Sequence, residues 1–297
     1  MQTKASDSLI KPLVLLLAEC IRRNLRPHRI LKTNMKLCIF QYPVAKGAVA
    51  SNLLEIEKGI EYASREKADL LCLPEMCTTG FDWRHMDSIL PHAEESILRI
   101  QSLAKASQIA ICGSFLSKQN SNKPTNTFYY IEADGTIAVR YNKIHLFKPF
   151  KEDLYLDAGD AIVSAPTQLG TIGCSICYDL RFPEIFRGCA LAGAEIQILP
   201  AAFPDPKLET WRTLVRARAI ENQNFVIAIN QTSDAYTLKA GEEDTFFGHS
   251  MVVNPSGEVL FEAGTKRSMD MVAIDLSEVQ KARSGLPSLQ DRRTDLY

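Results

Sequence analysis

Apolar residues recur along the chain with the spacing of strands in some segments and of helices in others. Residues 36–41 form a short apolar run that ends in polar residues, which is typical of a strand. The next segment has apolar residues three or four positions apart, with Ser51 or Asn52 placed to cap a helix. These apolar residues are Leu53, Ile56, Ile60 and Ala63. The pattern therefore predicts a strand followed by an amphipathic helix.

The same alternation continues through the rest of the chain. Apolar runs predict strands over 69–74, 109–115, 171–177, 195–200, 225–230 and 271–275. Helical spacing predicts helices over 92–107, 182–194 and 209–222. Turn sequences at 133–135 and 254–257 predict two hairpins, which pair 126–131 with 136–141 and 251–253 with 258–261.

Helices that alternate with apolar strands indicate a buried sheet in a layered α/β fold. The two hairpins exclude a purely parallel sheet. We therefore expect an α/β sandwich with mixed sheets. No glycine-rich phosphate loop follows the first strand, which argues against a dinucleotide-binding fold.

The composition fits a compact enzyme of one large domain or two small ones. The chain has 297 residues, of which 46% are hydrophobic and 23% charged, and its formal net charge is −1. This balance does not favour nucleic acid or an anionic membrane as a partner. Most of the eight cysteines lie inside apolar runs, which predicts buried thiols in a reducing, cytoplasmic compartment. Examples are Cys38, Cys72, Cys112 and Cys189.

Residues 1–34 are more basic than the rest of the chain. The apolar run Leu13–Ala18 is too short to cross a bilayer and lacks the features of a secretory signal. Three interpretations stay open: a peripheral helix, an organelle presequence, or upstream sequence that is not native to the fold. We expect the folded domain over 35–297, because Met35 directly precedes the first strand. The basic residues are Lys4, Lys11, Arg22, Arg23, Arg26, Arg29 and Lys32, against Asp7 and Glu19.

Cys177 is the first candidate for catalysis. It ends the predicted strand 171–177, and Pro183, which suits the first turn of a helix, follows soon after. A thiol at such a junction can lie beside free backbone N–H groups, which stabilise a thiolate or an oxyanion. Taken alone, however, the position fits a buried structural cysteine better.

Cys174 and Cys177 form a C-x-x-C pair, so redox and zinc chemistry must be considered. A zinc site needs further ligands, and the five histidines have no matching spacing, so we expect no metal site. A redox pair usually has both cysteines at a helix start, whereas Cys174 is predicted inside the strand. The pattern therefore disfavours both interpretations.

Two further segments place an ionisable residue in apolar surroundings. Glu75 directly follows the strand that stops at Pro74, and burial there would raise the pKa of its carboxyl group, as a general base requires. Lys143 follows the predicted hairpin among aromatic and aliphatic residues, where its ammonium can donate to an oxyanion. Taken singly, a solvent-exposed glutamate and a lysine that extends its ammonium to water are the simpler interpretations.

Together and in this order, the three segments resemble the signatures of the nitrilase superfamily of carbon–nitrogen hydrolases. The superfamily's Glu-Lys-Cys triad corresponds to Glu75, Lys143 and Cys177. A further glutamate of the superfamily corresponds to Glu152, on a weaker match because the loop length varies. The resemblance runs from about Met35 to the C-terminus. The matching sequences are LPEMCTTGF (73–81), YNKIHLF (141–147) and CYDLRFPE (177–184).

The resemblance implies a four-layer α-β-β-α sandwich and a homodimer or larger homo-oligomer. It also implies acyl transfer on a small amide, with no metal or organic cofactor. Glu75 would take the proton of Cys177, whose thiolate attacks the amide, and water would hydrolyse the thioester after ammonia leaves. Lys143 and the backbone N–H of Tyr178 would hold the oxyanion. Glu152 would position Lys143 or Glu75.

The substrate is less well defined by sequence. Residues 75–81, residues 197–203 and the terminal RRTDLY are most similar to the omega-amidase branch, which acts on terminal amides of short dicarboxylic and keto acids. Deaminated-glutathione amidases share much of the pattern, and N-carbamoyl amino acid hydrolases share the triad. A nitrilase is disfavoured, because Cys177 is followed by Tyr-Asp rather than Trp-Glu. Arg181 is a candidate for binding a substrate carboxylate, with an internal ion pair as the alternative.

Two other classes of function stay open. One is a catalytically silent protein used for interaction, which the intact triad argues against. The other is a glutaminase half that feeds ammonia to a synthetase, which would need a partner protein because the chain has no second nucleotide-binding domain.

Overall fold

The computed structural model of the chain describes residues 33–118, 122–233 and 245–296. The chain divides into two units, 1–32 and 33–297, and all described residues belong to the second. The prediction for residues 1–34 therefore falls mostly outside the described residues. Thr33 and Asn34 are exceptions, and Asn34 is the first residue of β1 (Asn34–Gln41). The folded domain thus begins slightly before Met35.

Six strands form the first sheet, in the order β12-β1-β2-β3-β4-β5. β1, β2 and β3 are parallel, whereas β12, β4 and β5 pair antiparallel with their neighbours. β4 and β5 form the first predicted hairpin. The strands are β1 (Asn34–Gln41), β2 (Leu70–Cys72), β3 (Ala110–Ser117), β4 (Thr125–Ile131), β5 (Ile137–Asn142) and β12 (Ser268–Asp275).

Six further strands form the second sheet, in the order β11-β10-β9-β8-β7-β6. β7, β8 and β9 are parallel, whereas β6, β10 and β11 pair antiparallel with their neighbours. β10 and β11 form the second predicted hairpin. The strands are β6 (Ser164–Thr167), β7 (Gly170–Cys174), β8 (Ile196–Ala201), β9 (Phe225–Asn230), β10 (Met251–Val253) and β11 (Val259–Glu262).

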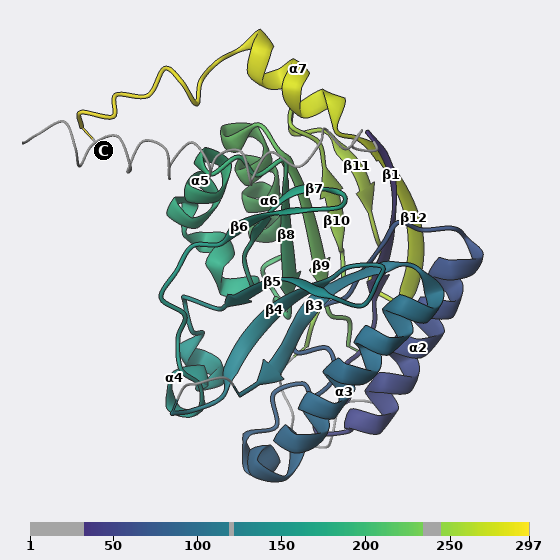
Figure 1. Cartoon of the computed structure of the whole chain (residues 1–297). Coiled ribbons are helices and arrows are strands. Elements are labelled where there is room, and N and C mark those ends of the chain that lie inside the picture. Colours follow the sequence, from purple (N-terminus) through teal and green to yellow (C-terminus); the bar gives the residue numbers. More distant parts are fainter. Residues whose placement is uncertain (1–32, 119–121, 234–244, 297) are drawn as a thin grey trace, which may run out of the picture. The chain divides into compact units, whose positions relative to one another are not determined.

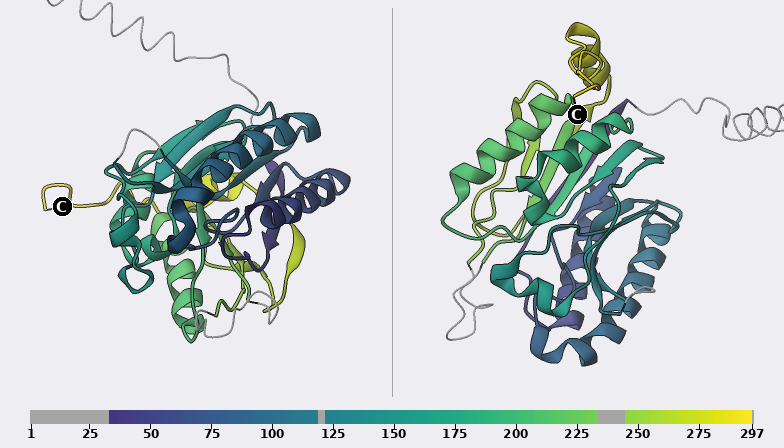
Figure 2. Two further views of the ribbon diagram at one scale, coloured as in Figure 1. Left: turned by 90° about the horizontal axis from the view of Figure 1, so that it is seen from below. Right: turned by 90° about the vertical axis from the view of Figure 1, so that its left-hand side faces the viewer.

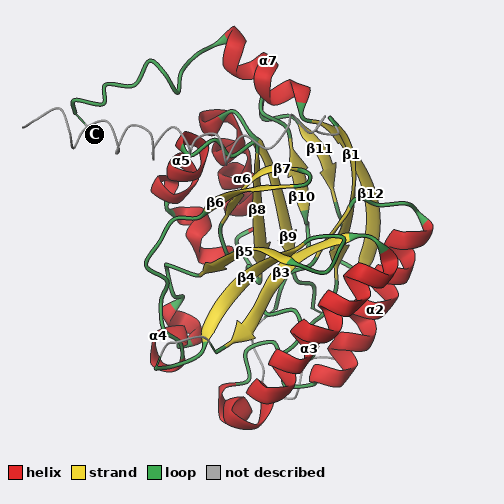
Figure 3. Ribbon diagram, viewed as in Figure 1, coloured by secondary structure: helices red, strands yellow, loops and turns green. Residues whose placement is uncertain are grey.

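Two long helices cover the outer face of each sheet, which gives four layers (Figure 1, Figure 2). α2 (Val49–Arg65) and α3 (Met86–Ser107) lie against the first sheet. α5 (Pro183–Leu191) and α6 (Leu208–Asn222) lie against the second (Figure 3). The predicted α-β-β-α sandwich with mixed sheets is therefore confirmed.

The alternation of side chains along the strands accounts for these layers. Leu37 and Ile39 of β1 belong to the core that the first sheet shares with the second. Cys38 and Phe40 alternate with these two residues along β1 and point to the other face of the sheet. They pack with the apolar faces of α2 and α3. The inner strands β2, β3, β8 and β9 are thus buried on both faces, which is why they read as continuous apolar runs rather than alternating ones. The edge strands β5, β6 and β11 stay partly exposed.

Some element ends differ from the predicted ones where the chain turns locally. β7 ends at Cys174 rather than at 177, because the chain turns into the short 3₁₀ helix η3 (Cys177–Arg181). α3 begins at Met86 rather than at 92, with Pro91 accommodated inside the helix. β6 and three helices of three or four residues were not predicted, because they are too short for a periodic pattern. These helices are η1 (Trp83–His85), η2 (Lys148–Phe150) and α4 (Glu152–Tyr155). α7 (Ser277–Gly285) was not predicted either, because Val279 is its only buried residue and gives no apolar periodicity.

The cysteines predicted to be buried are buried and free of disulfides. Among the helices that the structure describes, none has both the length and the hydrophobicity needed to cross a bilayer.

We expect that a chain beginning at Thr33 unfolds within about 2 °C of the full chain, because the core is built from later residues. A chain beginning at Met35 should melt lower by roughly 2–4 °C, since it loses the hydrogen bond from Leu276 N to Thr33 O (2.9 Å) and the pairing of Asn34 with Asp275. Thermal unfolding of the three chains measures both effects. A large loss on removal of 1–32 would contradict the proposed domain start.

Candidate active site

The four residues predicted for catalysis come from both sheets. Glu75 follows β2 after Leu73 and Pro74, Lys143 directly follows β5, and Glu152 is the first residue of α4. Cys177 is the first residue of η3, which follows β7 in the second sheet. The structure brings all four together, although they are far apart in the sequence.

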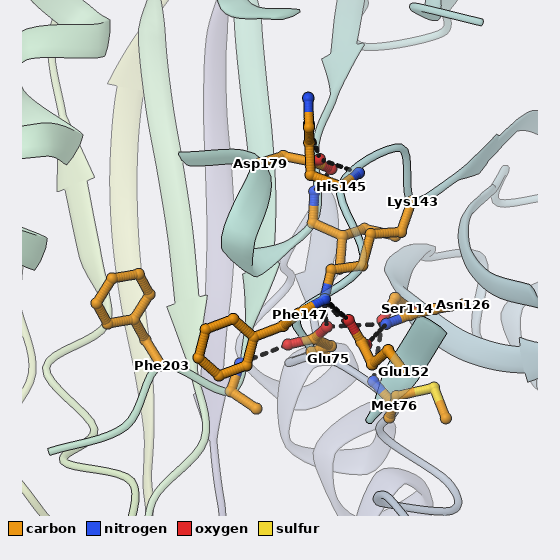
Figure 4. Close-up of polar contacts among 12 residues, drawn as sticks. Glu75, Met76, Ser114, Asn126, Lys143, His145, Phe147, Glu152, Asp179 and Phe203 are labelled. Atoms are coloured by element: carbon orange, nitrogen blue, oxygen red, sulfur yellow. Dashed lines mark hydrogen bonds and ion pairs between the residues drawn. The ribbon is translucent and has the colours of Figure 1, made fainter. Parts of the chain in front are cut away.

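A buried ammonium between two carboxylates forms the centre of the site. Lys143 Nζ lies 2.8 Å from Glu75 Oε1 and 2.8 Å from Glu152 Oε2, and all three side chains are at most 1% exposed. Figure 4 shows the lysine extended towards both carboxylates. Such a buried charge is tolerated only with partners that replace its hydration. Each of the three groups therefore requires the others.

Further donors hold the two carboxylates in place. Asn126 Nδ2 donates to Glu75 Oε1 (2.8 Å) and to Glu152 Oε1 (3.4 Å). The backbone N–H of Ala202 donates to Glu75 Oε2 (2.8 Å), and that of Phe147 donates to Glu152 Oε2. The sequence analysis missed Asn126 and Ala202. Asn126 was visible only as a polar residue in a predicted strand, and Ala202 acts through its backbone.

The thiol of Cys177 lies beside the Glu75 carboxylate and the backbone N–H of Ala202. Burial, followed by the charge of Glu75, raises the pKa of this thiol well above its ordinary value, and Lys143 offsets only part of the rise. The group at rest is therefore a thiol beside a carboxylate that can accept its proton.

Burial and neighbouring charges also shift the pKa values of Glu75 and Lys143. Burial raises the pKa of Glu75, and the attraction of Lys143 does not fully compensate. Burial alone would lower the pKa of Lys143, but the carboxylates of Glu152 and Glu75 outweigh it and raise that pKa. The result is a carboxylate with increased proton affinity next to an ammonium that stays charged.

Two residues of the site have left-handed backbone conformations. φ is +46° at Cys177 and +45° at Met76, which follows Glu75. Such conformations cost about 1–2 kcal/mol for a non-glycine residue and persist where the surroundings fix them. Ser114 Oγ accepts the N–H of Met76 (2.9 Å), and Gln231 Nε2 donates to the carbonyl of Glu75 (2.7 Å). Both contacts fix the backbone that carries the carboxylate.

The remaining predicted residues lie beside this cluster. Tyr178 is half-buried and packs against the rings of Phe147 and Phe182, with centroids 5.0 and 5.3 Å apart. Arg181 is exposed, and its guanidinium lies 5.5 Å from the ring centroid of Phe203. Within the described residues it makes no ion pair, so the alternative of an internal ion pair finds no support there.

Neither metal nor disulfide chemistry is apparent among the described residues. No group of three or more potential ligands gathers there. Cys174 ends β7 inside the core, and burial raises the pKa of its thiol, whereas Cys177 lies on the following turn. This placement does not give the C-x-x-C pair a shared helix start. The site instead has the parts needed for nucleophilic catalysis: a thiol, a carboxylate acceptor for its proton, and a charged donor.

Known proteins are similar to this chain in sequence and in fold. Residues 36–284 match the family model of the carbon-nitrogen hydrolases. The chain is 35% identical over 260 residues to a 2-oxoglutaramate amidase of Bacillus subtilis (strain 168), which covers 86% of this chain and 97% of that protein. It is 29% identical over 277 residues to the omega-amidase NIT2 of Homo sapiens, with 89% and 97% covered.

A solved structure is similar over nearly the whole domain. The carbon-nitrogen hydrolase from Helicobacter pylori G27 superimposes with a TM-score of 0.82 at 29% identity, and the match covers 89% of this chain and 97% of that one. Because the family model matches most of the sequence, this chain belongs to the carbon-nitrogen hydrolase family and is an enzyme that hydrolyses a carbon–nitrogen bond.

Proposed function

We propose that this enzyme hydrolyses a small amide through a thioester on Cys177 and releases ammonia. The observation that carries the proposal is the proximity of the Cys177 thiol to the Glu75 carboxylate, in a buried site where Lys143 bridges Glu75 and Glu152. A thiol, a proton acceptor and a charged donor in contact are the three parts that thiol-dependent acyl transfer needs.

The charges of the site favour proton transfer at the moment of attack. Two carboxylates and one ammonium leave an excess of one negative charge, and ionisation of Cys177 alone would add a second in the same buried volume. Transfer of the thiol proton to Glu75 keeps the total charge of the site unchanged. Glu75 therefore acts as the base while sulfur attacks the amide carbon, and afterwards returns the proton to the departing ammonia.

Lys143 and the N–H of Tyr178 hold the oxygen that becomes negative in the tetrahedral intermediate. Lys143 suits this role because the carboxylates on both sides keep it charged. Glu152 touches Lys143 with both of its oxygens (3.0 and 2.8 Å), so it orients the ammonium rather than the substrate. Water, activated by Glu75, then hydrolyses the thioester.

The substrate is an omega-amide, the terminal amide of a short dicarboxylic or keto acid. The similarity to a 2-oxoglutaramate amidase and an omega-amidase supports this choice. Such a substrate has a carboxylate at its far end that needs a cation. Arg181 and Lys207 both lie over aromatic rings beside the site, Arg181 over Phe203 and Lys207 over Phe147 (5.5 and 5.8 Å). Figure 4 shows the ring of Phe147 between Glu75 and the ring of Phe203. We assign the carboxylate to Arg181.

We also propose a cytoplasmic homodimer. Seven cysteines of the described residues are free and buried, which suits a reducing compartment. Leu191 at the end of α5 and Ile220 on α6 are large apolar side chains exposed on the helices that flank the nucleophile, and Leu286 and Leu296 are exposed in the C-terminal segment. A second copy would cover such residues.

Replacement of the nucleophile gives the most direct test. Cys177→Ala should lower kcat by at least about 10³-fold, because residues that act as one unit fail together. Mass spectrometry of the parent enzyme with an amide substrate should find an acyl group on Cys177. Cys174→Ala is the matched control and should keep kcat within about 3-fold. An acyl group on Cys174, or an active Cys177→Ala enzyme, would refute the assignment.

Replacement of Glu75 and replacement of Lys143 should impair catalysis in different ways. Glu75→Gln removes the proton acceptor, so both formation and hydrolysis of the thioester should become very slow. The pKa of Cys177 should nevertheless fall in this variant, because the charge of Glu75 raises it. The pH dependence of alkylation by iodoacetamide measures that pKa. Lys143→Met removes the oxyanion donor and should cost about 2.7–4 kcal/mol of transition-state stabilisation or more, measured as kcat/KM. Near-parental kinetics in either variant would show the triad to be misassigned.

The substrate assignment predicts dependence on a distant carboxylate. Succinamate should be hydrolysed with a kcat/KM at least about 10-fold above that of its methyl ester, which corresponds to about 1.4 kcal/mol. Arg181→Met should remove this preference by slowing the acid alone, with Lys207→Met as the matched control. A carbamoyl amino acid and an aliphatic nitrile complete the panel, with ammonia as the readout. Equal rates for acid and ester, or preference for the carbamoyl compound, would reject the omega-amide assignment.

A further inference from the structure

Another buried carboxylate, that of Asp179, lies outside the cluster of Glu75, Lys143 and Glu152. Asp179 is fully buried and accepts four hydrogen bonds. Its Oδ2 accepts the Tyr141 hydroxyl (2.7 Å) and the backbone N–H of Ile176 (2.9 Å). Its Oδ1 accepts the backbone N–H (3.1 Å) and Nδ1 (2.9 Å) of His145. None of these donors belongs to the proposed catalytic residues.

The four donors come from two segments that each carry a reacting group. Tyr141 and His145 lie two residues before and two residues after Lys143, and the Tyr141 hydroxyl also accepts the N–H of Ile144 (3.3 Å). Ile176 directly precedes Cys177. One carboxylate thus connects the segment that carries the ammonium, from the first sheet, to the turn that carries the thiol, from the second.

Asp179 also closes the strained turn around Cys177. Its backbone N–H donates to the carbonyl of Ile176 (3.0 Å), while its carboxylate accepts the Ile176 N–H (2.9 Å). Cys177 lies inside this closed turn with φ +46°. A conformation of this kind persists only where neighbouring contacts fix it, and these two bonds are the contacts that fix it here.

Ring stacking between His145 and Phe182 adds a second contact between the segment of Lys143 and the turn of Cys177. The His145 ring stacks on Phe182, with centroids 3.4 Å apart and planes 4° apart. Figure 4 shows Asp179 and His145 on one side of Lys143, with Glu75 and Glu152 on the other. His145 therefore holds Asp179 and does not extend to the carboxylates of the site.

We propose that Asp179 is a positioning residue that fixes the sulfur of Cys177 relative to the ammonium of Lys143. The inference rests on the proposed roles of these two residues. Asp179 touches neither substrate nor the reacting atoms, so its loss affects the approach of thiol, carbonyl and ammonium rather than substrate binding. A displacement of about 1 Å in such a geometry can cost on the order of 10²-fold in rate.

Asp179→Asn keeps the shape of the side chain but provides only one acceptor oxygen for donors on both sides. Backbone N–H groups cannot reverse, so the amide NH₂ must face a donor on at least one side. We expect kcat to fall by about 10²-fold while KM stays within about 3-fold. A thermal melt accompanies the kinetics, to show that the variant is folded.

A matched pair at His145 separates positioning from bulk packing. The side chain of His145 is 30% exposed, so neither replacement opens a sealed core. His145→Ala and His145→Asn both lose the stacking on Phe182, but only asparagine can place an N–H near the position of Nδ1. We expect kcat to fall by roughly 10-fold in His145→Ala and to recover most of that loss in His145→Asn, with KM unchanged in both.

The outcomes distinguish this inference from the proposed function. If Cys177→Ala is inactive but Asp179→Asn keeps kcat within about 3-fold, the inference is wrong and the proposed function stands. If Asp179→Asn does not fold, the comparison of His145→Ala with His145→Asn tests the inference instead. Equal losses in His145→Ala and His145→Asn would overturn the inference, since they would indicate packing or proton transfer by the imidazole. An active Cys177→Ala enzyme would refute both.

Discussion

The buried ammonium of Lys143 is the charge on which the site depends. An ammonium removed from water is stable only where carboxylates replace its hydration, and Glu75 and Glu152 do so at 2.8 Å each. Those carboxylates need their own donors in turn, which Asn126 and the N–H of Ala202 provide. One positive charge therefore determines which polar groups the surrounding structure has to place.

The geometry of the reaction is set by how the two sheets pack. The first sheet carries the charged groups, while the second carries the thiol of Cys177 and the N–H of Ala202. The hydrogen bonds near the site that join the two include those of Ala202 to the side chain of Glu75, of Gln231 to the Glu75 carbonyl, and of the His145 segment to Asp179. The shared apolar core holds the sheets together, and these bonds determine the detailed alignment.

Sequence could predict what depends on local periodicity. The strands, helices and hairpins of the sandwich followed from apolar runs and turn residues, because buried strands have few alternatives. The end of β7 could not be predicted, since it depends on the bond of Asp179 to the backbone of Ile176. Asn126 and Gln231 could not be distinguished from other polar residues, because they contact Glu75 only across the folded chain. The triad itself was visible through family resemblance, not through spacing.

The raised pKa of Cys177 also limits when the nucleophile is reactive. Burial and the charge of Glu75 keep the group a thiol, and thiols react slowly with oxidants and electrophiles compared with thiolates. An amide carbon placed against sulfur changes this, because attack and proton transfer to Glu75 then proceed together. The developing oxyanion meets a lysine that its carboxylate neighbours keep charged. The same excess of negative charge that restrains the free enzyme therefore supports catalysis once substrate is bound.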